Sequence, residues 1–288
     1  MDKIKAKMYS YKFILPAAFI YFILFLLPMF LSFFFSMTWW TLTNWKFIGL
    51  ENFIEFFSEQ SLNIGFKNTI IYAVLTCALK VIFGIIIATI LTTKIKTKNF
   101  LRAIIFSPAI LSTVAVGAAF SSMMHPTLGI INKILSIFGI VGPDWLGNTK
   151  IALFSVIFVD VWKGVGIATV IFIAGIMSIP NQYYEAVMVD GGNFFDKFKN
   201  ITLPLSRPAM NTVIILSFIG GLRTFDLIWV MTNGGPGFST DVIGSIIYKQ
   251  YASGFYGLST AGNVIMFILI ALVSFPLYKF LSNSEVEL

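Results

Sequence analysis

The sequence has few charged residues and a single cysteine, and both scarcities limit the class of protein. Asp, Glu, Lys and Arg make up 11% of the 288 residues, whereas 57% are hydrophobic and the mean hydropathy is +0.87. A water-soluble chain of this length cannot bury that much apolar surface, so lipid is the expected solvent. Cys77 lies within an apolar run, and a lone cysteine excludes an intrachain disulfide.

The chain also lacks the G-x-x-x-x-G-K-[ST] loop that cradles nucleotide phosphates. We therefore expect no cofactor in this chain, and any ATP that drives it must be hydrolysed, with Mg²⁺, by another subunit. Composition alone leaves nucleic acid open as a partner of a chain with a net charge of +7. The placement of the charges, described below, argues against it.

Six hydrophobic segments predict six transmembrane helices and an all-α, polytopic membrane protein. They are residues 13–35, 69–93, 103–124, 151–179, 209–231 and 261–278. At 1.5 Å per residue the first covers roughly 34 Å, which exceeds a hydrocarbon core of about 30 Å and is too long for a cleaved signal peptide. Trp39, Trp40 and Trp45 follow it, as in an aromatic belt. The apolar residues 129–140 are too few to cross and predict a helix along the interface.

The positive charges predict the orientation. With the N-terminus inside, twelve Lys and Arg fall in inner segments: Lys3, Lys5, Lys7, Lys12, Lys94, Lys96, Lys98, Arg102, Lys197, Lys199, Arg207 and Lys279. Five fall in outer segments: Lys46, Lys67, Lys133, Lys150 and Lys249. Because inner loops carry the excess of positive charge, both termini are expected in the cytoplasm. The basicity then reflects topology rather than nucleic-acid binding.

A polar stretch at residues 181–205, between the fourth and fifth predicted spans, organises the chain. Pro180 lacks the donor that a first helical turn leaves unpaired, so it can precede a helix over residues 182–189. Gly191 and Gly192 permit a sharp turn, and a second short helix over residues 193–199 should end before Pro204. From spacing alone, an ordinary charged loop is an equal alternative.

The residues of this stretch resemble the "EAA" loop of ATP-binding-cassette (ABC) importer permeases. The resemblance rests on Glu185, Ala186, Asp190, Gly191, Phe198, Leu203, Pro204 and Pro208. The family pattern runs E-A-A, three residues, G, about nine residues, L-P, and Val187 replaces its second alanine. In that family the loop docks into a cytoplasmic ATPase. The resemblance therefore implies an ABC type I permease fold and a coupling role for Glu185, Ala186, Asp190, Gly191, Phe198 and Pro204.

Two further stretches resemble the carbohydrate branch of these permeases, the maltose-type and glycerol-phosphate-type importers. One is the F-D-x-x-x-x-x-T-x-G-G-P run that begins at Phe225 and ends at Pro236. The other is the W-x-G of Trp162 and Gly164. The resemblance covers residues 68–281, so we expect a permease core there and an N-terminal segment, residues 1–67, that adds the first span and an external loop.

The resemblance implies the transmembrane subunit of a bacterial, binding-protein-dependent sugar importer, with an oligosaccharide as the expected substrate. It would reside in the cell (inner) membrane and be no enzyme itself. The expected partners are a second homologous permease, two cytoplasmic ABC ATPases, an extracytoplasmic solute-binding protein, the sugar and the lipid bilayer.

Charges inside the predicted spans mark a candidate substrate pathway, because intramembrane charges are costly and face protein or water. Asp160 and Lys163 are three apart and share a helix face, and Arg223 and Asp226 are expected to do the same on the next span. All four lie roughly 9–18 Å from the outer ends of their spans. With the positions that the resemblance adds, the candidate pathway comprises Asp160, Trp162, Lys163, Gly164, Ser217, Gly220, Gly221, Arg223, Thr224 and Asp226.

Other interpretations remain. The charge pairs would equally serve as structural salt bridges or docking contacts, and Lys80 would either snorkel or face the bundle. A permease for glycerol phosphate or another small polar solute, with Arg223 as anchor, is one alternative function. An ion-driven secondary transporter is another, although the paired broken helices of inverted repeats are not evident in the sequence. No metal-binding pattern is present in the sequence.

Overall fold

The computed structural model describes residues 11–41, 43–58, 60–93 and 95–283. Lys3, Lys5, Lys7 and Lys94, which enter the charge count above, lie outside the described residues. The chain divides into two compact units, one of residues 1–59 with 247–268 and one of residues 60–246 with 269–288. Each is described by itself.

The first unit contains the N-terminal span and a small hairpin. A short 3₁₀ turn, η1 (Tyr11–Ile14), leads into a span that runs through α2 (Leu15–Tyr21), a π-helical turn η2 (Phe22–Leu26) and α3 (Leu27–Phe35). Strands β1 (Thr38–Trp40) and β2 (Trp45–Phe47) pair antiparallel, with Trp40 opposite Trp45. This hairpin was not predicted from the sequence. Helix α4 (Glu51–Ser58) follows.

Buried Asn52 of α4 holds this unit together at the hairpin. Its amide donates to the carbonyl of Ser36 at 2.9 Å and to that of Thr38 at 2.8 Å. Phe56, one turn further along α4, is fully buried, and a side chain at Gly262 would collide with its ring. The α4 helix therefore packs on the first half of α16 (Tyr256–Ser282) as well as on the hairpin.

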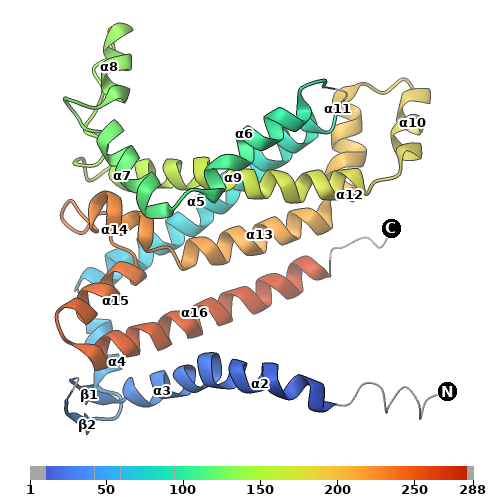
Figure 1. The fold of residues 1–288 in the computed structure, drawn as a ribbon. Helices are drawn as coiled ribbons and strands as arrows, with labels where there is room; N and C mark the ends of the chain where they lie inside the picture. The colour runs from blue at the N-terminus through green and yellow to red at the C-terminus, as the bar shows by residue number, and fades with distance from the viewer. Residues whose placement is uncertain (1–10, 42, 59, 94, 284–288) are drawn as a thin grey trace. The chain divides into compact units, whose positions relative to one another are not determined.

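The second unit is built around two long helices, α5 (Gln60–Leu91) and α9 (Ala152–Met177), packed along each other (Figure 1). The other helices of its sequence are α6 (Lys98–Ile110), α7 (Thr113–Met123), α8 (Ile130–Ile137), α10 (Asn181–Val189), α11 (Phe194–Lys197), η3 (Phe198–Thr202), α12 (Leu203–Leu205), α13 (Arg207–Leu222), α14 (Asp226–Thr232) and the start of α15 (Ile243–Ala252). Helix α13 packs on α5 and α9, and α6 packs on α9. The two central helices thus contact α6, α13 and α14.

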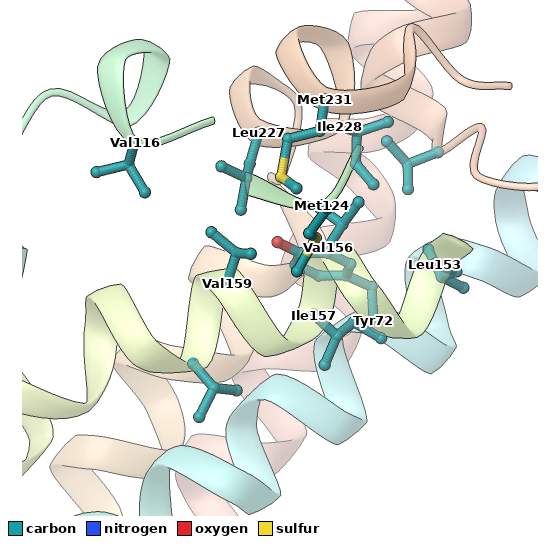
Figure 2. Packing of buried hydrophobic residues seen from close by; sticks show 12 residues of the cluster. Tyr72, Val116, Met124, Leu153, Val156, Ile157, Val159, Leu227, Ile228 and Met231 are labelled. Carbon is teal, nitrogen blue, oxygen red and sulfur yellow. The ribbon is translucent and has the colours of Figure 1, made fainter. Parts of the chain in front are cut away.

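Two hydrophobic clusters fill this unit. One gathers side chains of α5, α7, α9 and α14 around Tyr72, Val156 and Ile228 (Figure 2). The other joins α5, α9 and α13 around Phe172, with Ala88 and Val213. Gly84 allows the close approach, because a side chain there would lie 3.0 Å from Cβ of Ala168. Hydrophobic packing therefore fixes α5 against α9 along their length.

The third predicted span, residues 103–124, is broken, which corrects the expectation of a straight helix. Helices α6 and α7 meet at an angle of 96°, with Leu111 extended between them. Pro108 removes a backbone donor from the last turn of α6, which weakens the helix there. Beyond the bend, α7 packs on α14, where a side chain at Gly117 would lie 2.9 Å from Val230.

The fifth predicted span, residues 209–231, is also broken. Helix α13 ends at Leu222, and α14 begins only at Asp226, so Arg223 and Asp226 do not share one helix face as predicted. Within the described residues, four helices have the length and apolarity to cross a membrane, or six when two bent pairs, α6 with α7 and the helical path Phe194–Leu205 with α13, each count as one span. The short helix predicted within residues 129–140 is present as α8. Its place at the interface stays a prediction.

Candidate functional site

The polar stretch of residues 181–205, named here the elbow loop, forms two helical arms that meet at a glycine turn (Figure 1). Helix α10 follows Pro180 and ends at Val189, which confirms the predicted first arm. Gly191 has φ +81°, a left-handed conformation in which L side chains are strained. The predicted turn is therefore present at the predicted glycine.

A capping box begins the second arm. The Asn193 side chain accepts hydrogen bonds from the amides of Phe195 and Asp196, and the Asp196 carboxylate accepts from the Asn193 amide at 2.8 Å. These bonds satisfy amides that a helix start leaves unpaired. The helical path then continues from Phe194 to Leu205 through a π-helical turn, so the expectation of an end before Pro204 is wrong. The first turn of α12 accommodates the proline, because a first turn does not use its amide.

The predicted coupling residues divide between the outside and the base of the elbow loop. Glu185, Ala186 and Asp190 are exposed on α10 and at the turn, whereas Phe198 and Pro204 are half-buried. Phe198 packs against the hydrophobic cluster of α5, α9 and α13. The elbow loop therefore has an anchored base and a free tip.

Further contacts stabilise the two arms. The hydroxyls of Tyr184 and Thr202 lie 3.2 Å apart and join α10 to η3. The amide of Gly192 donates to the carbonyl of Val187 at 2.8 Å, and a side chain at Gly192 would collide with that of Val187. The departure from the family pattern at Val187 is thus accommodated by packing over Gly192.

The tip presents apolar side chains that the described part of the chain leaves uncovered. The side chains of Val189, Phe194 and Phe195 are 87%, 60% and 65% exposed. A pocket of about 590 Å³ lies behind the tip, lined by the ends of α5 and α9 and by both arms, among them Thr92, Asn181 and Lys197. An apolar patch next to polar groups is typical of a docking surface.

The candidate pathway residues of α9 lie next to a charged residue of α5. The ammonium Nζ of Lys80 donates to Oδ2 of Asp160 at 2.7 Å, and their side chains are only 12% and 24% exposed. Gly164 lies one turn beyond Asp160, and a Cβ added there would meet Cε of Lys80 at 2.6 Å and its Nζ at 2.9 Å. The missing side chain at Gly164 therefore leaves the space that Lys80 occupies.

The same face of α5 meets α13 one and two turns earlier. A Cβ at Gly221 would lie 2.6 Å from Cα of Ala73 and 3.0 Å from Oγ1 of Thr76. Tyr72 is 1% exposed, and its hydroxyl lies near Thr224 without a hydrogen bond of standard geometry. Figure 2 shows this side chain reaching into the cluster beside Val156. The helix break after α13 thus places Thr224 beside α5.

These contacts bring seven residues of three helices together, named here the polar cluster. They are Tyr72, Thr76, Lys80, Asp160, Gly164, Gly221 and Thr224. The sequence predicted four of them as candidate pathway residues: Asp160 and Gly164 of α9, Gly221 of α13, and Thr224 just after the end of α13. It missed the three from α5, although Tyr72, Thr76 and Lys80 recur every fourth residue, a spacing that places them on one helix face.

The other predicted pathway residues lie outside the polar cluster. Lys163 is half-buried, and Trp162 packs with its ring centroid 5.1 Å from that of Phe120 on α7. Arg223 and Asp226 are exposed, and no ion pair joins them to each other in the part of the chain that is described. Ser217 is half-buried, whereas Gly220 is exposed with open space around it. Their role as pathway residues stays a prediction.

The glycine-rich run after α14 folds back onto α5. Asn233 adopts a left-handed conformation, φ 52°, and ends α14. The buried amide of Asn68 donates to the carbonyls of Ser239 and Asp241, both at 2.9 Å, and Oγ1 of Thr69 accepts from the amide of Ile243 at 3.0 Å. This run is therefore a specific structure attached to the first half of α5, rather than only a turn after a span.

The described residues include no group of three or more His, Cys, Asp or Glu arranged to hold a metal ion. The chemistry that the polar cluster offers is hydrogen bonding and one ion pair. The elbow loop offers an exposed surface that continues directly into α9 on one side and α13 on the other.

Comparison with known proteins gives consistent results. Residues 80–284 match the family described as binding-protein-dependent transport system inner membrane component. The trehalose/maltose transport system permease protein MalF of Thermococcus litoralis is 35% identical over 224 residues, which are 78% of this chain and 76% of the relative. The multiple sugar-binding transport system permease protein MsmF of Streptococcus mutans is 32% identical over 287 residues, 99% of both chains.

Solved structures share the fold. A chain of a bacterial ABC transporter involved in the import of the acidic polysaccharide alginate aligns with a TM-score of 0.85, 22% identity and 98% coverage of both chains. A bacterial alginate ABC transporter in complex with an alginate pentasaccharide-bound periplasmic protein aligns with a TM-score of 0.82 and 23% identity. At these identities the likeness shows the fold alone, and it confirms the ABC type I permease architecture.

Proposed function

Because the chain belongs to the family of binding-protein-dependent transport system inner membrane components, we propose that it is the membrane subunit of an ATP-driven sugar importer. MalF and MsmF are named for the transport of trehalose or maltose and of multiple sugars, which supports a sugar as the substrate. An oligosaccharide fits this set of relatives best, since a third relative, from Bacillus subtilis, is the arabinooligosaccharide permease AraP.

The observation that carries the proposal is the position of the elbow loop. It joins the last turn of α9 to the first turn of α13, and both helices contribute to the polar cluster. A partner that pulls on the tip therefore moves two helices of the candidate pathway at once. The exposed apolar residues Val189, Phe194 and Phe195 suit burial against a protein partner.

The partner at the elbow loop is one of two cytoplasmic ABC ATPases, which bind ATP and Mg²⁺ in place of this chain. A second, homologous permease completes the pathway, and an extracytoplasmic binding protein delivers the sugar. The alginate importer that shares this fold has been solved with such a periplasmic protein. In this proposal the protein resides in the inner membrane with both termini and the elbow loop in the cytoplasm, and ATP-driven closure of the ATPases produces alternating access.

The test compares two glutamates in the assembled complex. Glu185→Ala removes an exposed carboxylate of α10, and Glu55→Ala removes an exposed carboxylate of α4 as a matched control. We expect Glu185→Ala to lower both sugar uptake and the amount of ATPase that copurifies, while sugar capture by the binding protein stays intact. Glu55→Ala should leave all three unchanged.

Two results would contradict the proposal. Full uptake and full ATPase association in Glu185→Ala and in Gly191→Pro would remove the coupling role of the elbow loop. Uptake of sugar by the purified chain without any ATPase, driven by an ion gradient, would identify a secondary transporter instead. Uptake of glycerol phosphate rather than sugar would keep the importer but change its substrate class.

A further inference from the structure

The ion pair of Lys80 and Asp160 has spare hydrogen-bonding capacity. An ammonium has three donors and a carboxylate has about four acceptor sites, and the bond at 2.7 Å uses one of each. Both side chains keep a small exposed fraction, 12% for Lys80 and 24% for Asp160. A donor cation and an acceptor anion therefore lie side by side at a half-buried position within a long apolar helix pair.

A sugar matches this arrangement chemically. Each hydroxyl both donates and accepts, so two neighbouring hydroxyls can accept from Lys80 and donate to Asp160 at the same time. The pair carries no net charge, so it needs no charged ligand to balance it. The Tyr72 hydroxyl, buried and without a hydrogen bond of standard geometry, is a further polar group on the same face of α5.

Gly164 leaves the space in which the end of the Lys80 side chain lies. A Cβ there would meet Cε and Nζ of Lys80, so a larger residue at this position would displace the ammonium from its present place. The bond to Asp160 holds the charge of Lys80 over α9, instead of letting it extend toward the membrane surface as lipid-facing lysines do.

We propose that Lys80, held by Asp160 in the space left by Gly164, is a specificity-determining residue that binds adjacent hydroxyls of a neutral saccharide in the pathway. This inference rests on the proposed function and adds a residue of α5 that neither the sequence motifs nor the comparisons assign. Lys80 is the substrate contact, Asp160 holds its ammonium, and Gly164 leaves the space that it occupies.

The experiment exchanges the pair in the complete importer with its partner permease, ATPases and binding protein. The variant Lys80→Asp with Asp160→Lys keeps an ion pair but moves the cation to α9. The variant Lys80→Met with Asp160→Leu replaces the pair by apolar side chains, which often fold as well as a buried pair does. The exposed Lys133→Met on α8 is the matched control for loss of a lysine. The probes are radiolabelled maltose, trehalose and an alginate oligosaccharide.

We expect both pair variants to assemble with the ATPases while uptake of the neutral sugar falls at least tenfold, and Lys133→Met to transport normally. Neutral-sugar uptake within twofold of the unmodified complex in either assembled variant would show that the pair is only structural, and would overturn the inference. Uptake of the alginate oligosaccharide alone by the unmodified complex would overturn the neutral-saccharide assignment.

If neither pair variant assembles, Lys80→Arg tests whether Lys80 binds the sugar. This variant retains the positive charge and the bond to Asp160. Its larger, planar guanidinium does not fit the same space, so KM for neutral sugar should rise at least fivefold with a smaller change in kcat. An unchanged KM would overturn the inference. Failure of the unmodified complex to take up any sugar would instead overturn the proposed function, and this inference with it.

Discussion

Gly220 and Gly221 are neighbours on α13 with opposite surroundings. A Cβ at Gly221 would lie 2.6 Å from Cα of Ala73, a backbone atom that cannot move aside. A Cβ at Gly220 would meet nothing within 4 Å. The family resemblance placed both in the candidate pathway and did not distinguish them. The structure assigns close packing to Gly221 and open space to Gly220.

This difference predicts opposite effects of the same substitution. Gly221→Ala should destabilise the protein by about 1–3 kcal/mol, because the added methyl overpacks the α5–α13 contact. Gly220→Ala should leave stability unchanged or raise it by up to about 1 kcal/mol, since alanine favours a helix over glycine. Thermal unfolding in detergent measures both. Equal midpoints for the two variants would contradict the packing described here.

The residues of the polar cluster show what the sequence could and could not predict at this scale. Asp160 stood out because a carboxylate within a span is costly, and the structure pairs it with Lys80. Its partner was not identifiable, because Lys80 lies 80 residues earlier and meets it only once α5 packs on α9. The role of Lys80 was accordingly left open at the sequence level. The period of four in Tyr72, Thr76 and Lys80 is the available signal for that face of α5.

Helix breaks set the limit of prediction at the scale of elements. Hydropathy identified the apolar segments, but it is insensitive to bends, so α6 with α7 and α13 with α14 were each expected as one helix. Pro108 is a local signal for the end of α6, whereas the contact of α7 with α14 beyond the bend is tertiary information. The elbow loop was predicted well because its determinants, Pro180 and Gly191, act locally. Its capping box at Asn193 was also local and was overlooked.

The capping box at Asn193 leads to a prediction about the second arm of the elbow loop. Asn193→Ala removes the side-chain acceptor for two amides and should destabilise α11 by about 0.5–2 kcal/mol. Because α11 holds Phe194 and Phe195 at the tip, less ATPase should copurify with this variant. Asn193→Ser retains a capping oxygen and is the matched control. Identical ATPase recovery from the alanine and serine variants would show that the arm is ordered by its partner instead.

A second element-scale prediction concerns the attachment of the glycine-rich run to α5. Asn68→Leu leaves the carbonyls of Ser239 and Asp241 without this donor, at a cost of about 1–3 kcal/mol for each buried group. Thermal stability should fall, and protease cleavage within residues 233–242 should become faster. Asn63→Leu changes an exposed asparagine of the same helix and should have neither effect. Comparable cleavage of the two variants would argue against a structural role for Asn68.

The apolar helices of the chain differ in whether their surface is exposed or is buried against other helices. The span of residues 15–35 has no buried residue in its most apolar window, whereas half of the corresponding window of α9 is buried within the chain. Helix α9 therefore lies inside the second unit, whereas the N-terminal span keeps its apolar surface exposed. The apolar composition predicted a membrane protein. Hydropathy does not show, however, which of the apolar helices is buried within a bundle.

Orientation is the whole-molecule property that the positive-inside count predicts, twelve basic residues against five, and it decides whether the elbow loop reaches an ATPase. The single native cysteine makes it measurable. In a Cys77→Ser background, Lys199→Cys places one thiol in the elbow loop and Lys133→Cys places one on α8, and both positions are exposed. A membrane-impermeant maleimide added to intact spheroplasts should label the α8 thiol and spare the elbow-loop thiol, and both should react after lysis. Labelling of the elbow-loop thiol in sealed spheroplasts would place this loop outside, where no ATPase could bind it, and the coupling mechanism would have to be abandoned.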